Sequence, residues 1–321
     1  MHRSTLDTIV FFDTEIDPHN QKILDIGAVT DGGNTFHQPN VHAFLEFFKG
    51  NHYACGHNIF LHDLKYIGKV ISKAGIPPHH CIDTLFLSPL LFPAKPYHRL
   101  VKDDKLQTDE INNPLNDSIK ARDLFFDEVE AFRRLPDGLK FIYSGLLAHK
   151  RGFTGFFNFN SQSTFDGDLK SLIHRQFDRA ICHHASLDSI IAQHPVELAY
   201  SLALIYSFTV SERDFSITPP WVMRNFPDVE RITFLLRNTP CIPGCPYCRQ
   251  ALDIHRGLKR FFGFDSYRTY GGEPLQEKAV QAAVQHQSIL AIFPTGGGKS
   301  ITFQVPALMS GENSRGLTIV I

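Results

Sequence analysis

The order of apolar and polar positions predicts alternating strands and helices over the first 135 residues. Residues 8–30 read as two strands joined by a turn, and residues 52–58 as another short strand. Apolar residues three or four apart predict helices over 41–49, 60–75 and 115–135. Residues 81–93 read as a strand that runs into a proline-bounded loop. Because strands that alternate with helices are typical of α/β domains, we expect one up to residue 135.

The pattern changes after that point. Helical candidates fill most of 136–240, whereas 288–293 and 317–321 read as apolar core strands. A domain seldom stops inside a core strand, so we expect the chain to be the N-terminal portion of a longer protein. The expected divisions are an α/β domain at 1–135, a mostly helical region at 136–240, a cysteine-rich knuckle at 241–258 and a further domain at 259–321.

Composition and charge exclude a few classes of protein. The formal charge of −1 excludes a wholly basic nucleic-acid binder, although a basic groove can exist within a neutral total. The 43% hydrophobic and 20% charged fractions are typical of globular proteins. No run of 18 apolar residues predicts a membrane span, and the N-terminus is too acidic for a signal peptide. We therefore expect a cytoplasmic protein without a membrane partner.

Four carboxylates in the first domain are candidate metal ligands. Asp13 and Glu15 lie two residues apart on a predicted strand, so both side chains share one face. Two carboxylates on a buried strand repel each other unless a cation or a proton offsets the repulsion. Asp63 lies at the start of one predicted helix and Asp117 in the first turn of another.

These blocks, DTE, HN-x-x-x-HD and D-S-x-x-A-x-x-L-F, resemble in their order the DEDD family of 3′–5′ exonucleases. The resemblance covers about residues 7–130 and implies a ribonuclease H-like fold. It also implies that Asp13, Glu15, Asp63 and Asp117 hold two Mg²⁺ or Mn²⁺ ions, which suit hard oxygen ligands. The implied reaction is phosphodiester hydrolysis at the 3′ end of DNA, with single-stranded ends as the expected substrate.

One position departs from the family pattern. The His-bearing branch has histidine five residues before the last aspartate, where this chain has Asn112. His98 has the same spacing to Asp103, which gives a rival third block with His98 as the general base. An alternative function is therefore an inactive exonuclease fold that serves as a nucleic-acid-binding module.

Three closely spaced cysteines indicate a metal centre. Cys241, Cys245 and Cys248 form C-x3-C-x2-C in a chain without a secretion signal, which favours metal over disulfides. The fourth ligand of a structural zinc site could be His255 or a distant group, namely Cys182, His183 or His184. The spacing also resembles radical S-adenosylmethionine enzymes, whose cysteines hold an iron–sulfur cluster, and a glutaredoxin-like redox pair is a further alternative.

A glycine-rich loop near the end predicts nucleotide binding. Residues 293–300, FPTGGGKS, follow an apolar run and precede a predicted helix. Backbone amides of such a loop cradle phosphates, Lys299 would reach the β- and γ-phosphates and Ser300 would bind Mg²⁺. The remaining loop positions that we expect to contact ATP are Thr295, Gly296, Gly297 and Gly298.

Residues 261–308 resemble the start of a RecQ-type DNA helicase. The resemblance implies adenine contacts from the aromatic–arginine pair Tyr267 and Arg268 and from Gln276. The acidic DExH box of such motors does not appear before residue 321, so we expect this chain to bind ATP without hydrolysing it. The sequence as a whole predicts a RecQ-like helicase fused to an exonuclease and acting in DNA repair or recombination.

Overall fold

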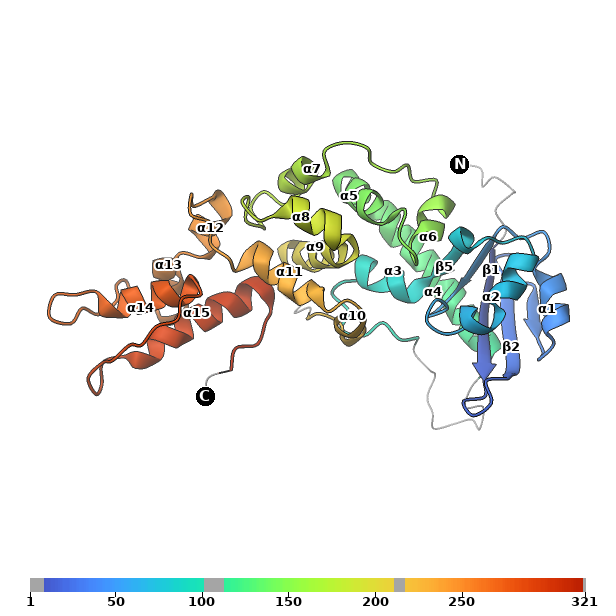
Figure 1. Ribbon diagram of the computed structural model, residues 1–321, viewed down its shortest axis with the longest axis horizontal. Coiled ribbons are helices and arrows are strands. Elements are labelled where there is room, and N and C mark those ends of the chain that lie inside the picture. The colour runs from blue at the N-terminus through green and yellow to red at the C-terminus, as the bar shows by residue number, and fades with distance from the viewer. Residues whose placement is uncertain (1–8, 101–112, 211–216, 320–321) are drawn as a thin grey trace. The chain divides into compact units, whose positions relative to one another are not determined.

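The computed structural model describes residues 9–100, 113–210 and 217–319, which belong to two compact units, Met1–Gly167 and Asp168–Ile321. The first unit holds a β-sheet and its covering helices, and the second is helical (Figure 1). The first unit continues past residue 135, because Phe125 and Phe132 of helix α4 (Pro114–Arg134) contact Phe156 of helix α6 (Thr154–Phe159). Because these aromatic side chains pack together, α4 and α6 belong to the same unit.

The sheet of the first unit is mixed and has the order β3-β2-β1-β4-β5. β2 runs antiparallel to β1 and β3, whereas β4 runs parallel to β1 and β5. The strands are β1 (Ile9–Ile16), β2 (Ile23–Thr30), β3 (Thr35–His37), β4 (Tyr53–Gly56) and β5 (Cys81–Asp83). The parallel strands β1, β4 and β5 therefore have their carboxyl ends at one edge, where polar side chains commonly form sites.

Helices cover both faces of this sheet, as alternating side chains of β1 require. Phe11 contacts Phe125 of α4 on one face, whereas Phe12 contacts Phe44 and Phe48 of α1 on the other. The helices of this unit are α1 (Val41–Phe48), α2 (Leu64–Lys73), α3 (Thr84–Leu91), α4 (Pro114–Arg134), α5 (Asp137–Leu147) and α6 (Thr154–Phe159), with a 3-10 turn at Pro78–His80.

The segment predicted as a strand and a loop at 81–93 is mainly a helix. The strand ends at Asp83, whose carboxylate accepts a hydrogen bond from the Leu85 backbone N–H and so begins α3. Pro89 lies within the helix, and the apolar run that resembled a strand is buried on all sides. A short buried helix and a buried strand have the same apolar composition, which explains the difference.

The second unit confirms the helical prediction for the described part of 168–240 and continues as helices to residue 314. One hydrophobic core joins Cys182 and the cysteine knuckle to Tyr267 and to Val305 in the last helix. The helices are α7 (Leu169–Gln176), α8 (Leu187–Gln193), α9 (Pro195–Val210), α10 (Pro220–Asn225), α11 (Asp228–Arg237), α12 (Pro246–Ala251), α13 (Ile254–Phe262), α14 (Leu275–Val284) and α15 (Lys299–Ser314).

The two apolar strands predicted near the end are wrong. Residues 288–293 form no strand, and Leu290 and Ile292 are 90% and 81% exposed. Leu317 and Ile319 are also exposed and lie outside any strand, whereas residues 320 and 321 lie outside the described part. A strand requires a hydrogen-bonded neighbour, and the described residues of this unit supply none. None of the helices described is long and apolar enough to cross a membrane.

Candidate functional site

The acidic pair of β1 lies on the face of the sheet that helix α4 covers. Asp13 and Glu15 alternate with Thr14, so they share the face of Phe11, whose ring centroid lies 5.6 Å from that of Phe125. Phe11 is the last residue of β1 that pairs with β4. The acidic pair therefore lies beyond the last parallel pairing, at the carboxyl edge of the sheet.

Helix α4 brings Asp117 towards the same edge, because its first turn lies directly against strand β2. Gly27 of β2 pairs with Asp13, and a Cβ atom on Gly27 would lie 2.0 Å from the Leu115 backbone nitrogen. Only glycine leaves room for this approach. The Asn113 side chain begins the helix by accepting a hydrogen bond from the Leu115 N–H, and Asp117 follows in the first turn. The positive end of the helix dipole favours a carboxylate there.

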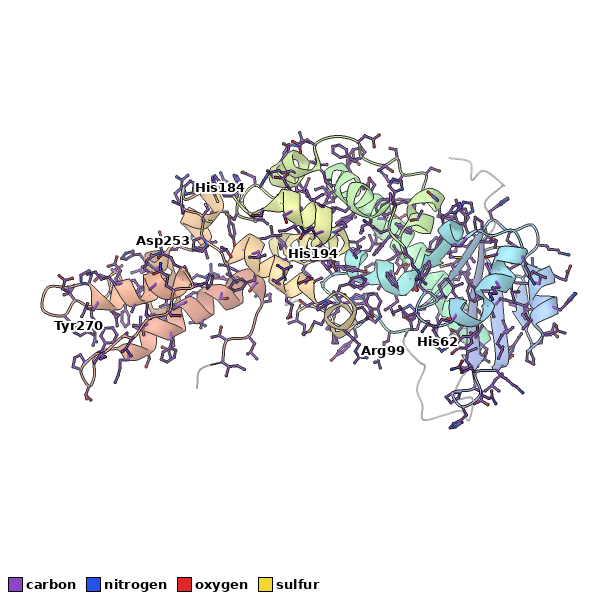
Figure 2. The ribbon with its side chains drawn as sticks, in the orientation of Figure 1. His62, Arg99, His184, His194, Asp253 and Tyr270 are labelled. Carbon is purple, nitrogen blue, oxygen red and sulfur yellow. The ribbon has the colours of Figure 1, made fainter. Side chains whose placement is uncertain are left out.

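Asp63 joins the acidic pair through the residue between its two members. It is 1% exposed, and its Oδ1 accepts hydrogen bonds from the Thr14 backbone N–H at 2.9 Å and from the Thr14 hydroxyl at 2.5 Å. His62 Nδ1 lies 3.6 Å from the Oδ2 atom of Asp63 (His62 is labelled in Figure 2). The contact with Asp63 raises the pKa of His62, and the negative charge of Glu15 acts in the same direction.

The described contacts therefore connect Asp63 and the first turn of α4 to the backbone beside Asp13. No three of the four predicted carboxylates have ligand atoms within 4.8 Å of one another, as far as the described residues were compared. Carboxylates that lie close together repel each other. A bound divalent cation, which takes carboxylate oxygens as ligands, offsets this repulsion.

The candidate general base His98 is buried, and its Nδ1 lies 2.9 Å from the Ser88 hydroxyl. Burial lowers the pKa of His98 to about 4, and burial together with the charge of His98 lowers the pKa of His57 to about 4 as well. Both rings are therefore neutral at pH 7. Asp103 and Asn112 lie outside the described residues.

Two buried acids that the sequence analysis did not single out lie behind this edge. Asp83 accepts hydrogen bonds from the backbone N–H groups of Asn58, Phe60 and Leu85, yet its burial raises its pKa to about 7. Glu128 of α4 is fully buried, both of its oxygens lack a hydrogen-bond partner among the described residues, and burial raises its pKa strongly. Asp83 thus orders the loop that leads to Asp63. An aspartate within an otherwise apolar predicted strand was the signal in the sequence that could have identified Asp83.

The cysteines of the second unit converge with a residue that is distant in sequence. The ligand atoms of Cys182, His184, Cys241 and Cys245 all lie within 4.8 Å of one another (His184 is labelled in Figure 2). Cys248 lies beside them, since its thiol influences the pKa values of Cys182 and Cys245. The four thiols and one imidazole give more ligands than a single tetrahedral ion requires.

Backbone N–H groups point at these sulfur atoms. The His184 N–H donates to Cys182 Sγ over 3.4 Å, and the Cys245 N–H donates to Cys241 Sγ over 3.2 Å. Burial alone would raise the pKa of Cys245, but hydrogen bonds from the backbone of Cys248 and His183 and from neighbouring thiols lower it to about 6. Burial raises the pKa of Cys182 to about 11. The surroundings thus favour a thiolate at Cys245.

His255, the fourth ligand expected from sequence spacing, is not part of this group. Its Nε2 lies 3.1 Å from Glu277 Oε1, and its ring contacts Tyr267 on the far side of α13's first turn. Six residues separate Cys248 from His255. Helix α12 ends within this segment and α13 begins after Asp253, so the chain turns away from the cysteines before it reaches His255.

The predicted phosphate loop precedes helix α15 as expected, and its backbone is held by the residues predicted to contact adenine. Arg268 Nη1 donates to the Gly296 carbonyl over 3.1 Å, and Gln276 Nε2 donates to the Gly298 carbonyl over 2.9 Å. The Tyr270 hydroxyl donates to the Gly297 carbonyl (Tyr270 is labelled in Figure 2).

Different physical reasons require glycine at the positions of this loop. Gly296 and Gly298 have φ of 75° and 67°, a left-handed conformation that glycine adopts without strain. At Gly297, a Cβ atom would lie 2.8 Å from the Pro294 carbonyl oxygen. Lys299 and Ser300 begin α15, so Thr295 and the three glycines form the turn at the positive end of that helix.

Comparison with known proteins finds relatives for part of the chain. It is 43% identical over 69 residues to ATP-dependent DNA helicase Q5 of Rattus norvegicus, which is 21% of this chain and 6% of that protein. It is 41% identical over 73 residues to ATP-dependent DNA helicase RecQ of Synechocystis, covering 23% and 13% respectively. RecQ of Bacillus subtilis is 39% identical over 72 residues, covering 21% and 11%.

The chain thus spans between 6% and 13% of the length of these relatives. No protein-family model matches it, and no solved structure matches it. The similarity supports a RecQ-like helicase segment of about 70 residues within this chain.

Proposed function

We propose that the first unit is a metal-dependent 3′–5′ exonuclease with a ribonuclease H-like fold. The observation that carries the proposal is that strand β1, the loop with Asp63 and the first turn of α4 lie together at one edge of the sheet. Asp63 accepts hydrogen bonds from Thr14, and the first turn of α4 lies against Gly27, which pairs with Asp13 in the sheet. The mixed sheet covered by helices on both faces supports the same assignment.

In this proposal Asp13, Glu15, Asp63 and Asp117 hold the metal ions, and the backbone holds the carboxylates. Two Mg²⁺ or Mn²⁺ ions about 4 Å apart supply an activated water and stabilise the leaving oxygen of a phosphodiester. Thr14 fixes one oxygen of Asp63, and the other oxygen, Oδ2, lies 3.6 Å from His62 Nδ1. The contact with Asp63 raises the pKa of His62 and so favours its positively charged form, which suits a polyanionic substrate.

A cleavage assay with a matched pair of variants tests this proposal. Asp117 and Asp123 lie on the same helix, but Asp123 is 64% exposed and pairs with Arg122. Asp117→Asn should lose at least 100-fold in Mg²⁺-dependent release of nucleotides from a labelled 3′ end, and Asp123→Asn should keep the parental rate. Equal rates in the two variants would refute the assignment.

A second function for the same unit is nucleic-acid binding without cleavage, as Asn112 at the usual histidine position suggests. A neutral amide cannot accept the proton that a general base removes. A chain that binds single-stranded DNA tightly and releases no nucleotide with either Mg²⁺ or Mn²⁺ would favour this alternative.

We further propose that the second unit contributes the ATP-binding start of a RecQ-like DNA helicase that acts in DNA repair. The sequence similarity supports this proposal, and so does the loop at 294–300, whose carbonyl oxygens accept hydrogen bonds from the side chains of Arg268 and Gln276. Side chains hold these loop carbonyls and the Gly297 N–H donates to the Pro294 carbonyl, so the other amides of the loop would bind the phosphates.

The cysteine group is proposed to hold one zinc ion, with Cys182, Cys241, Cys245 and Cys248 as ligands. Zinc–sulfur bonds of about 2.3 Å place tetrahedral sulfurs about 3.8 Å apart, which agrees with the sulfur atoms of Cys182, Cys241 and Cys245, since these lie within 4.8 Å of one another. An iron–sulfur cluster separates its cysteines further, since iron and sulfide lie between them. His184 is exposed, whereas Cys248 is buried and its thiol influences the pKa values of Cys182 and Cys245, so we assign the fourth place to Cys248.

Elemental analysis of reduced protein should find one zinc per chain. Cys182→Ser should lose it, because a three-thiolate site binds zinc far more weakly than a four-thiolate site. His184→Ala is the control and should keep the metal. Zinc retained by Cys248→Ala and lost by His184→Ala would contradict the ligand set.

A further inference from the structure

A cleft in the second unit is lined by an excess of positive charge that neither the phosphate loop nor the cysteine group uses. Its volume is about 470 Å³, and Asp253, labelled in Figure 2, marks one side of it. The lining includes the acids Asp253 and Glu312 and five basic side chains, which are Arg179, Arg237, Arg256, Arg260 and Arg315.

The two acids already have partners among the described residues. Glu312 forms an ion pair with Arg260, and the Asp253 carboxylate caps helix α13 by accepting hydrogen bonds from the backbone N–H groups of His255 and Arg256. Five guanidinium groups and two carboxylates leave an excess of positive charge in the lining of the cleft.

The buried guanidinium of Arg237 is the best-defined cation of this cleft. Its Cζ lies 5.8 Å from the ring centroid of Phe208 and 5.5 Å from that of Tyr247, and Arg315 lies 5.2 Å from the same Phe208 ring. The Nε and Nη1 atoms of Arg237 are shielded from solvent and have no hydrogen-bond partner in the described part of the chain. Burial and the charge of Arg315 lower the pKa of Arg237, although Tyr247 and Glu312 oppose this.

This arrangement is costly without an anion. Two guanidinium groups against one ring repel each other, and burial removes hydration from the Arg237 cation. Arginine binds phosphate through paired N–H donors, and aromatic rings beside it offer surfaces on which bases stack. The combination of fixed arginines and aromatic side chains is that of a site for the nucleic-acid backbone.

We propose that this cleft binds the phosphates of single-stranded DNA. Arg237 and Arg315 form its inner wall beside Phe208, and the exposed Arg179 and Arg256 form its rim. The site lies wholly within the second unit, so it does not depend on the exonuclease proposal. It gives that unit a DNA contact beside helix α13, separate from the residues that hold the phosphate loop.

The test uses the full chain, a fluorescein-labelled (dT)15 oligonucleotide and no added divalent metal, which prevents cleavage. The double variant Arg179→Gln/Arg256→Gln changes two exposed side chains, and Arg175→Gln/Arg224→Gln is the control with two exposed arginines outside the cleft. Loss of two phosphate contacts should weaken binding by roughly 25-fold at 0.1 M salt and reduce the slope of log K against log salt by about 1.4. The control should change neither quantity.

Photocross-linking with 4-thiothymidine locates the contact independently of affinity. The proposal expects cross-linked peptides that contain Phe208 or Tyr247, and fewer of them in the double variant. Cross-links confined to residues 1–167, with equal binding by parent and double variant, would overturn it. If the double variant binds DNA as the parent does but loses thermal stabilisation by inorganic phosphate, the cleft is a small-anion site and the DNA assignment is wrong.

Discussion

Gly27→Ala perturbs the contact that positions Asp117 without changing any proposed ligand. The added Cβ atom would lie 2.0 Å from the Leu115 nitrogen, whereas ordinary van der Waals contact begins at 3.4 Å. The first turn of α4 must therefore move by about 1.4 Å, or the strand must move by the same distance. Because the Cβ position is fixed by the backbone of residue 27 and the Leu115 nitrogen is a backbone atom, no side-chain rotation relieves the clash. Overpacking of this kind costs roughly 1–3 kcal/mol of stability.

The same movement should displace Asp117 from the acidic edge. A shift of about 1 Å in a positioned group can cost roughly 100-fold in rate, so we expect that loss in Mg²⁺-dependent cleavage at temperatures where the variant is folded. Gly68→Ala is the control, since its Cβ atom would meet only the Leu64 side chain at 3.7 Å. Circular dichroism melting and nucleotide release should be measured on both variants. A Gly27→Ala protein with parental melting temperature and parental rate would refute the described packing of α4.

Three further predictions follow from individual contacts. Asp63→Ala should lower the free energy of unfolding by about 2–4 kcal/mol in urea denaturation, because two hydrogen bonds from Thr14 lose their acceptor. Asp123→Ala, which removes an exposed carboxylate, should lower it by less than about 1 kcal/mol, and equal effects would contradict the geometry. The pKa of His98 is about 4 in the folded protein and 6.5 in the unfolded chain, so the protein loses stability as the pH falls from 6.5 to 4. His98→Gln should remove about 3 kcal/mol of this pH-dependent change in the free energy of unfolding. An unchanged pH dependence would show that the ring is not buried as described. Lys299→Ala should weaken ADP binding by roughly 10- to 100-fold in titration calorimetry while Lys278→Ala, on the exposed side of α14, leaves it unchanged; equal affinities would remove the loop from the nucleotide site.

Local patterns in the sequence predicted the parts of the fold that depend on local geometry. The two-residue interval between Asp13 and Glu15 predicted their common face, and apolar spacing predicted the long helix within one residue at each end. The glycines of the phosphate loop predicted a turn before a helix, and in the structure Gly298 is the N-cap of the helix that begins at Lys299. These features follow from the periods of strands and helices, which the sequence contains directly.

Features that depend on distant residues could not be predicted in the same way. Cys182 lies far in sequence from Cys241, so the sequence could name it only as one of several alternatives to His255, which helix α13 turns towards Glu277. The apolar run at 288–293 predicted a strand, but a strand depends on neighbours as well as on its own composition. The five arginines of the cleft come from four separate segments, since only Arg256 and Arg260 share a helix, and they have no common motif.

The central claim, that four carboxylates of the first unit form one two-metal site, is tested most directly by Mn²⁺ titration followed by electron paramagnetic resonance. The account predicts two bound Mn²⁺ ions per chain with the exchange-coupled spectrum of ions about 4 Å apart. Asp117→Asn should lose the coupled signal, and the exposed Asp123→Asn should keep it. Two uncoupled ions, or a coupled signal that survives Asp117→Asn, would contradict the claim.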